Sequence, residues 1–147
     1  CDLMLSCRLK LTPIEKKKSG LYINFCCPKK VTKMQIKNLT KKTAISRHGK
    51  ICEDALSKFM GLMFSLKQKN ALIFKFGKEK IVSLHMLFVF YPIDVLFLND
   101  KKYVVGMKKN FAPFTFYKSK KKAMYAIELP SGTIKKTKTG IGDKIKF

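Results

Sequence analysis

From Met34 to Phe147 the chain consists of short runs in which apolar and polar residues alternate, separated by turn residues. Alternation with a period of two is typical of half-buried β-strands. It predicts eight or nine strands. They are expected at residues 34–38, 43–47, 71–76, 103–107, 113–117, 123–129 and 143–147, with two more inside 81–100. Gly77 and residues 78–80 are expected to form a turn after the third of these strands.

One segment has the spacing of an amphipathic helix. Glu53 and Asp54 place negative charge in its first turn, and apolar residues recur at intervals of three or four over 55–63. Strands and helices do not alternate along the chain, so a doubly wound sheet is not expected. The pattern predicts a mainly β fold, a small jelly-roll-like sandwich or barrel with one principal helix.

Residues 81–100 form the most apolar stretch of the chain. Their number matches a membrane-spanning helix, but His85, Tyr91-Pro92 and Asp94 interrupt the apolar run. The residue before a proline is biased away from the helical conformation. The stretch is therefore expected to form two buried strands with a break between them, in a water-soluble protein without a transmembrane segment.

Residues 1–33 differ from the remainder of the chain, because they show no sustained period of either two or 3.6. We expect them to be a disordered extension or an over-extended gene start, preceding a single β-rich domain at 34–147. Four of the five cysteines lie in this first part, and no two cysteines have CxxC spacing. An odd number of cysteines without metal-binding spacing indicates reduced thiols and a cytoplasmic location.

The charge of the chain is strongly positive. Lysine and arginine number 32 against nine acidic residues, which gives a formal net charge of +23, and only Arg8 and Arg47 are arginines. A lysine is a hydrated point charge without the planar fork that reads bases or carboxylates. Part of the excess reflects the composition that an AT-rich genome favours, and the remainder favours diffuse attraction to polyanions.

Several segments, taken in order, resemble the domain of unknown function 192 family in its archaeal form. They are MGLMF at 60–64, ALIFKF at 71–76, SLHMLFVFYPIDVLFLND at 83–100, APFTFY at 112–117, AIELPSGTI at 126–134 and GDKIKF at 142–147. The resemblance covers residues 35–147 and implies a small, mainly β domain with one helix and no established activity. One departure stands out, because similar sequences tend to carry arginines where this chain has Met60 and Ser65.

Two residues in the apolar stretch have side chains that could exchange a proton or bind a ligand. His85 can exchange a proton near neutral pH, although a histidine in a strand is more often hydrogen-bonded in a core. Asp94 is costly to bury unless it is partnered, so it is expected either on the solvent face, capping a turn, or in a site. The hypothesis is a ligand site in which His85, Asp94, Tyr117 and a lysine such as Lys121 face one concave surface. Neither a catalytic motif nor a metal-binding spacing occurs, so no cofactor is expected.

Three functional interpretations remain open. The first is a ligand-binding or interaction module, whose partner is an unknown small molecule or protein. The second is a nucleic-acid or other polyanion binder, in which lysines supply charge beside the stacking surfaces of Phe114, Phe116 and Tyr117. Those lysines are Lys118, Lys120, Lys121 and Lys122. The third is an enzyme that uses Asp94 and His85 in acid–base roles.

Overall fold

The computed structural model describes residues 34–52 and 70–147. These residues form nine strands and one short helix. In chain order they are β1 (Met34–Asn38), β2 (Thr43–Cys52), β3 (Ala71–Lys80), β4 (Ser83–His85), β5 (Ile93–Leu98), β6 (Val104–Phe111), β7 (Phe116–Lys118), β8 (Ala123–Pro130), α2 (Thr133–Lys136) and β9 (Ile145–Lys146). The mainly β fold that the sequence predicts is confirmed. The helix expected at 53–63 lies outside the described residues.

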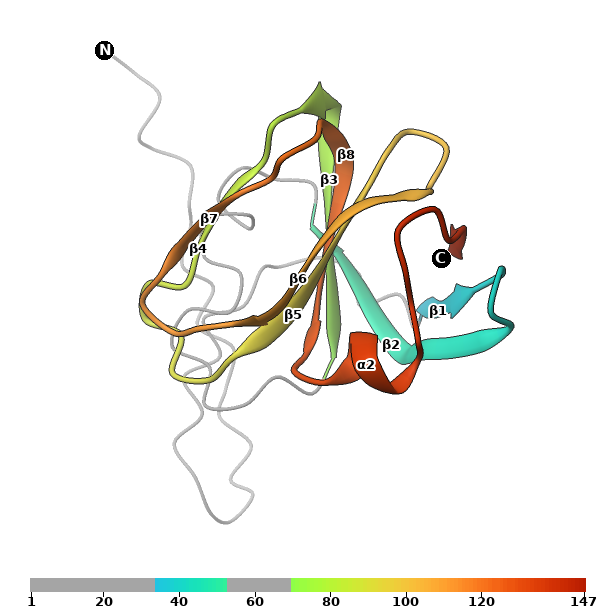
Figure 1. Ribbon diagram of the computed structural model, residues 1–147, viewed down its shortest axis with the longest axis horizontal. Coiled ribbons are helices and arrows are strands. Elements are labelled where there is room, and N and C mark those ends of the chain that lie inside the picture. The colour runs from blue at the N-terminus through green and yellow to red at the C-terminus, as the bar shows by residue number, and fades with distance from the viewer. Residues whose placement is uncertain (1–33, 53–69) are drawn as a thin grey trace, which may run out of the picture.

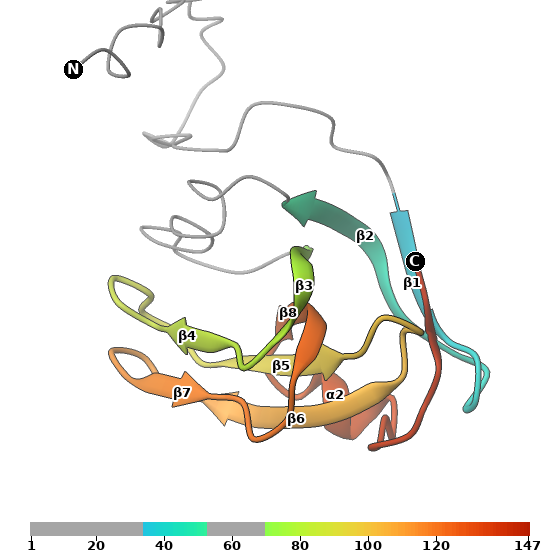
Figure 2. The same ribbon diagram turned by 90° about the horizontal axis from the view of Figure 1, so that it is seen from above.

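Seven strands form one curled sheet in the order β6-β5-β8-β3-β2-β1-β9 (Figures 1 and 2). Within this sheet β2 and β3 pair in parallel and the other neighbouring strands pair antiparallel. The two edge strands approach each other at an isolated bridge between Tyr103 and Lys144. The sheet is therefore a half-barrel whose edges touch at one point.

The inside of the curled sheet holds one of the two hydrophobic cores. Side chains alternate between the two faces of a strand. In β5, Leu96 and Leu98 point to the inside, where they pack with Ile127 of β8 and with Ile134 of α2. We call this cluster the inner core. Short helix α2 closes it from one end, since Ile134 is only 1% exposed.

The outer face of the same sheet carries the second core. Ile93, Val95 and Phe97 of β5 point to this side and pack with Phe74 of β3 and Ala126 of β8. The two-stranded sheet of β4 and β7 lies over them and contributes Leu84 and Tyr117. We call this cluster the outer core. All six residues of β5 are buried, because both faces of this strand are covered.

A buried polar cluster joins the β1–β2 hairpin to the end of the chain. The Asn38 side-chain amide donates to Asp143 Oδ2 at 2.8 Å and to Thr139 Oγ1 at 3.3 Å. Burial acts to raise the pKa of Asp143, but the Gly140 N–H, the Asn38 amide and the charge of Lys41 outweigh it, so the pKa is lowered. The cluster therefore stabilises the ionised carboxylate and holds β9 beside β1.

Three local predictions were wrong. The strand expected at 113–117 is one of them, because residues 113 and 114 lie in a turn and β7 begins only at Phe116. The turn expected at 77–80 is absent, because β3 continues to Lys80 and still pairs with Ala123 of β8 there. Short helix α2 was not predicted, since its residues 133–136 are too few to show a helical period. The two strands with a break expected inside 81–100 are present as β4 and β5.

Candidate functional site

Asp94 is a structural residue of the inner face. Its side chain is 2% exposed, and both carboxylate oxygens accept hydrogen bonds from backbone N–H groups. Asn110 N donates to Oδ1 at 3.0 Å and Ile134 N donates to Oδ2 at 2.9 Å. The buried carboxylate thus connects β5 to the end of β6 and to the first turn of α2, and it does not lie on the solvent face.

His85 and Tyr117 lie in the two-stranded sheet, where they point to opposite faces. Tyr117 pairs with Leu84 and stacks on Phe97 at 5.8 Å between ring centroids, so it belongs to the outer core. His85 pairs with Phe116, and their ring centroids are 6.5 Å apart on the other face. Because Asp94 points to the inner core, the structure does not bring these three side chains to one concave surface.

The lysines of residues 118–122 are all exposed. Lys118 ends β7, and Lys121 follows it in the turn before β8. Ser119 fixes this turn, because its hydroxyl accepts from Val82 N and donates to the Lys121 carbonyl, each at 2.9 Å. Tyr117 is partly buried and packs against the outer core, where its ring stacks on Phe97, so it does not offer an open face beside these lysines.

Four phenylalanines are exposed at one end of the molecule. Two loops, residues 86–92 after β4 and residues 112–115 after β6, lie side by side there in both views (Figures 1 and 2). The exposed fractions are 46% for Phe88, 58% for Phe90, 55% for Phe114 and 70% for Phe116. We call these four residues the phenylalanine end. Phe114 and Phe116 were named from the sequence, with Tyr117, only as stacking surfaces of the polyanion interpretation, and Phe88 and Phe90 were not named.

The two loops are joined by backbone hydrogen bonds around Met86. Its carbonyl accepts from Phe114 N at 3.0 Å and from Val89 N at 3.3 Å, while its N–H donates to the Thr115 carbonyl at 2.9 Å. The Met86 side chain is 1% exposed and lies in the outer core. A buried anchor therefore fixes both loops, so the exposed rings are displayed from a defined scaffold.

Both loops hold a phenylalanine in a backbone conformation that favours glycine. Phe88 has a φ of 58° and Phe114 a φ of 57°. For a bulky residue the left-handed region costs roughly 1–2 kcal/mol. Strained residues of this kind persist where the surrounding structure fixes them, and they cluster at functional sites. Four other non-glycine residues, Lys42, Lys102, Asn110 and Lys138, also have a positive φ, so this conformation does not by itself single out the two phenylalanines.

Among the residues that the structure describes, the charges around the phenylalanine end are positive. Residues 86–93 and 111–117 contain no charged side chain, and lysines flank the second segment. Lys109 and Lys118 are exposed, and Lys108 places its Nζ 5.3 Å from the centre of the Tyr117 ring. Of the acidic residues in the described ranges, only Glu79 and Asp100 are exposed. They lie together elsewhere, because Asp100 N donates to Glu79 Oε1.

Glu128 is a buried acid in an apolar part of the outer face. It lies in β8 between Leu72 of β3 and Val95 of β5, and it is 8% exposed. Its Oε2 has no hydrogen-bond partner. Burial raises the pKa of Glu128 to about 8, so the carboxyl is mostly neutral at pH 7.

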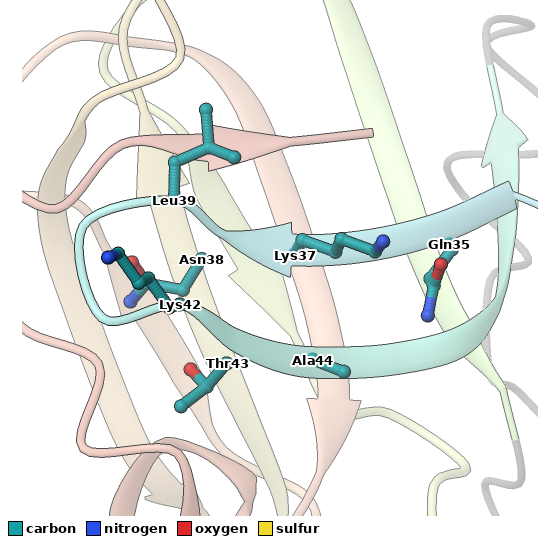
Figure 3. A pocket seen from close by; sticks show the side chains of 7 residues that line it. All are labelled: Gln35, Lys37, Asn38, Leu39, Lys42, Thr43 and Ala44. Atoms are coloured by element: carbon teal, nitrogen blue, oxygen red, sulfur yellow. The ribbon is translucent and has the colours of Figure 1, made fainter.

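A shallow depression of about 450 Å³ follows the β1–β2 hairpin (Figure 3). Its lining residues are Gln35, Lys37, Asn38, Leu39, Lys42, Thr43 and Ala44. Its two lysines could attract an anion, but the Asn38 amide is already engaged by Asp143. Open shape and few convergent polar groups make it a poor candidate for a small-molecule site.

Two further types of site are absent from residues 34–52 and 70–147. These ranges hold no cluster of three or more His, Cys, Asp or Glu side chains that could bind a metal ion. Nor do they contain a helix with the length and hydropathy needed to cross a membrane.

The fold and the site define a small curled-sheet β protein with an exposed aromatic end. Residues 34–147 match the domain of unknown function 192 family, described as Uncharacterized ACR, and the chain belongs to this family. A UPF0127 protein of Pyrococcus furiosus is 35% identical over 112 residues, which are 75% of this chain and 95% of the relative. A UPF0127 protein of Thermococcus sibiricus is 36% identical over 112 residues, which are 75% of this chain and 72% of the relative.

Two solved structures share the fold. A protein of unknown function from Novosphingobium aromaticivorans has a TM-score of 0.68 at 17% identity, covering 77% of this chain and 82% of its own. A Sinorhizobium meliloti protein has a TM-score of 0.67 at 21% identity, covering 76% of this chain and 89% of its own. The latter has a name that suggests transcription regulation. At these identities the likeness concerns the fold alone.

Proposed function

We infer that this protein is an interaction module whose contact surface is the phenylalanine end. The observation that carries this inference is the display of four exposed phenylalanine rings, three on the two loops joined at Met86 and one, Phe116, at the start of β7. An exposed apolar patch of this kind marks an interaction site in soluble proteins. The partner is expected to combine an apolar surface with negative charge, since lysines flank the rings and the two exposed acids within 34–52 and 70–147 lie elsewhere.

A polyanion binder of the single-strand type is less well supported. Such proteins stack bases on open aromatic faces that follow a charged groove. Here Phe90 and Phe114 meet edge to face at 5.5 Å and 77°, and Tyr117 is covered. An enzyme using Asp94 and His85 is also disfavoured, because the Asp94 carboxylate is occupied by two backbone N–H groups.

Anilinonaphthalene sulfonate tests this function, because the dye combines an apolar ring system with one negative charge. We expect its fluorescence to rise in the presence of the folded protein. Changing Phe88 to Gly and Phe116 to Ser together should lower the enhancement at least ~2-fold, since both substitutions remove exposed apolar surface. A titration of the full chain with the dye provides the measurement.

Ile141→Ser is the matched control, because Ile141 is 65% exposed but belongs to the segment between α2 and β9. This segment runs on the side of the molecule away from β4 and β7 (Figure 1). The fluorescence enhancement of the dye with this control variant should equal that with the unchanged chain. Near-ultraviolet circular dichroism verifies that each variant keeps its tertiary structure, which excludes dye binding to a partly unfolded state. Equal enhancement in the phenylalanine variant and the control would overturn the proposed function.

A further inference from the structure

We propose that the partner of the phenylalanine end is the surface of an anionic lipid bilayer, an inference that rests on the proposed function. Phe88, Phe90, Phe114 and Phe116 would enter the interfacial region, and nearby lysines would contact the headgroups. An apolar element of limited depth beside lysines is the pattern of proteins that lie on a membrane without spanning it. Three features of the phenylalanine end favour this partner over a protein or a nucleic acid.

The first feature is the type of side chain. Protein–protein hot spots are enriched in tyrosine, tryptophan and arginine, which combine contact area with directed hydrogen bonds. The four exposed rings are all phenylalanine, and the two tyrosines of residues 86–93 and 111–117, Tyr91 and Tyr117, are partly buried against the outer core. Phenylalanine has no polar group to pair, so it fits a fluid apolar medium that offers no fixed hydrogen-bond pattern.

The second feature is the shape that the backbone gives to these rings. Phe88 and Phe114 each occupy a turn at a φ near +57°, where glycine would be the unstrained residue. The rings therefore stand on the tips of two turns that the Met86 carbonyl holds together. Two adjoining turns form a narrow projection. Such a projection can enter the interfacial region of a bilayer without a preformed complementary pocket.

The third feature is the kind of charge. Lys109 and Lys118 are exposed beside the uncharged tip, and Lys108 lies close by over Tyr117. Lysines contribute to membrane attraction individually and without a fixed geometry, as diffuse charges near an anionic surface do. The exposed acids Glu79 and Asp100 are held in a different part of the fold. The exposed apolar rings and the positive charges, which would both contribute to membrane binding, thus occur at the same end of the molecule.

Cosedimentation of the full chain with vesicles tests the inference. We expect binding to vesicles made of equal parts phosphatidylglycerol and phosphatidylcholine, weak binding to phosphatidylcholine alone, and a decrease as salt is raised. Changing Phe88 to Gly and Phe116 to Ser together should weaken binding at least ~10-fold. Lys109→Gln with Lys118→Gln should weaken it several-fold and flatten its salt dependence, while Ile141→Ser should leave it unchanged.

The variants separate this inference from simple adsorption of a basic chain and from unfolding. Phe88→Gly relieves a positive φ, so the melting temperature of this single variant should stay the same or rise, and weaker vesicle binding by the single variant cannot be attributed to unfolding. Near-ultraviolet circular dichroism verifies the tertiary structure of the double variant. Vesicle binding that survives the phenylalanine changes would overturn the inference, because charge alone would then be responsible.

Three outcomes distinguish the two proposals. If the dye binds at the phenylalanine end but vesicles do not, the lipid inference fails and the proposed function stands. If neither binds, both fail. If a single-stranded oligothymidylate binds in a phenylalanine-dependent manner and vesicles do not, the partner is a nucleic acid and the lipid inference is wrong.

Discussion

Replacing Asp94 by alanine is expected to lower the free energy of unfolding by about 3–5 kcal/mol. The carboxylate accepts from Asn110 N and Ile134 N, and hydrogen bonds to a charged group contribute about 1.5–3 kcal/mol each. Removing it leaves two buried donors without an acceptor and detaches α2 from β5. Urea unfolding of the variant and of the unchanged chain measures the difference.

Asp100→Ala is the control for Asp94→Ala. Asp100 also accepts a backbone hydrogen bond, from Lys101 N at 2.8 Å, but it is exposed to water. Water can replace that acceptor, so the loss should stay below about 1 kcal/mol. If Asp94→Ala proves as mild as Asp100→Ala, the carboxylate does not hold the end of β6 and α2 in place.

Glu128→Gln is expected to raise stability at neutral pH by about 3 kcal/mol. Burial raises the pKa of Glu128 in the folded protein from 4.5 to about 8. At pH 7 the folded carboxyl keeps its proton, while the unfolded chain releases it and gains solvation. Glutamine has the shape of the neutral acid and does not ionise in either state. The variant therefore keeps the stability that the unchanged protein loses when Glu128 ionises in the unfolded chain.

The same pKa sets the pH dependence of stability. The favourable contribution of neutral Glu128 is fully present below pH 4.5, and it decreases as the pH rises through about 8. Urea unfolding at several pH values should show this decrease for the unchanged chain and a flatter profile for Glu128→Gln. Asp143 acts in the opposite sense, because its lowered pKa contributes stability that is lost as the pH falls.

Glu79→Gln provides the comparison for Glu128→Gln, since Glu79 is an exposed glutamate at the end of β3. Its substitution should leave the pH profile almost unchanged. A Glu128→Gln variant with the same slope between pH 5 and pH 8 as the unchanged chain would show that Glu128 ionises normally in the folded protein.

The strands were predictable because the alternation of apolar and polar residues is a local property. The strand MQIKN was expected at the positions where β1 lies, and β4 and β5 fall on either side of the expected break near Pro92. The parallel pairing of β2 with β3 could not be predicted in the same way, because it depends on the chain between Cys52 and Ala71. Strand register is set by contacts between distant residues, which a local period does not report.

The candidate site was only partly predictable, for a similar reason. An acid in an apolar strand indicates that Asp94 has a partner, but the partners are backbone N–H groups at positions 110 and 134, which have no side-chain signature. The display of Phe88 depends on a positive φ that its residue type disfavours. A local signal for a turn existed next to Phe114, because Pro113 is typical of the second position of a turn, but the alternation of the segment favoured a strand over 113–117.

Fluorescence of a single tryptophan tests the central claim most directly, since the chain contains none. Phe116→Trp places the reporter at the phenylalanine end, and Ile141→Trp places it on the other side of the molecule. On addition of phosphatidylglycerol vesicles we predict that Trp emission at position 116 shifts to shorter wavelength and is quenched by brominated lipid, whereas that at 141 is not. Unchanged emission at position 116 would contradict the account.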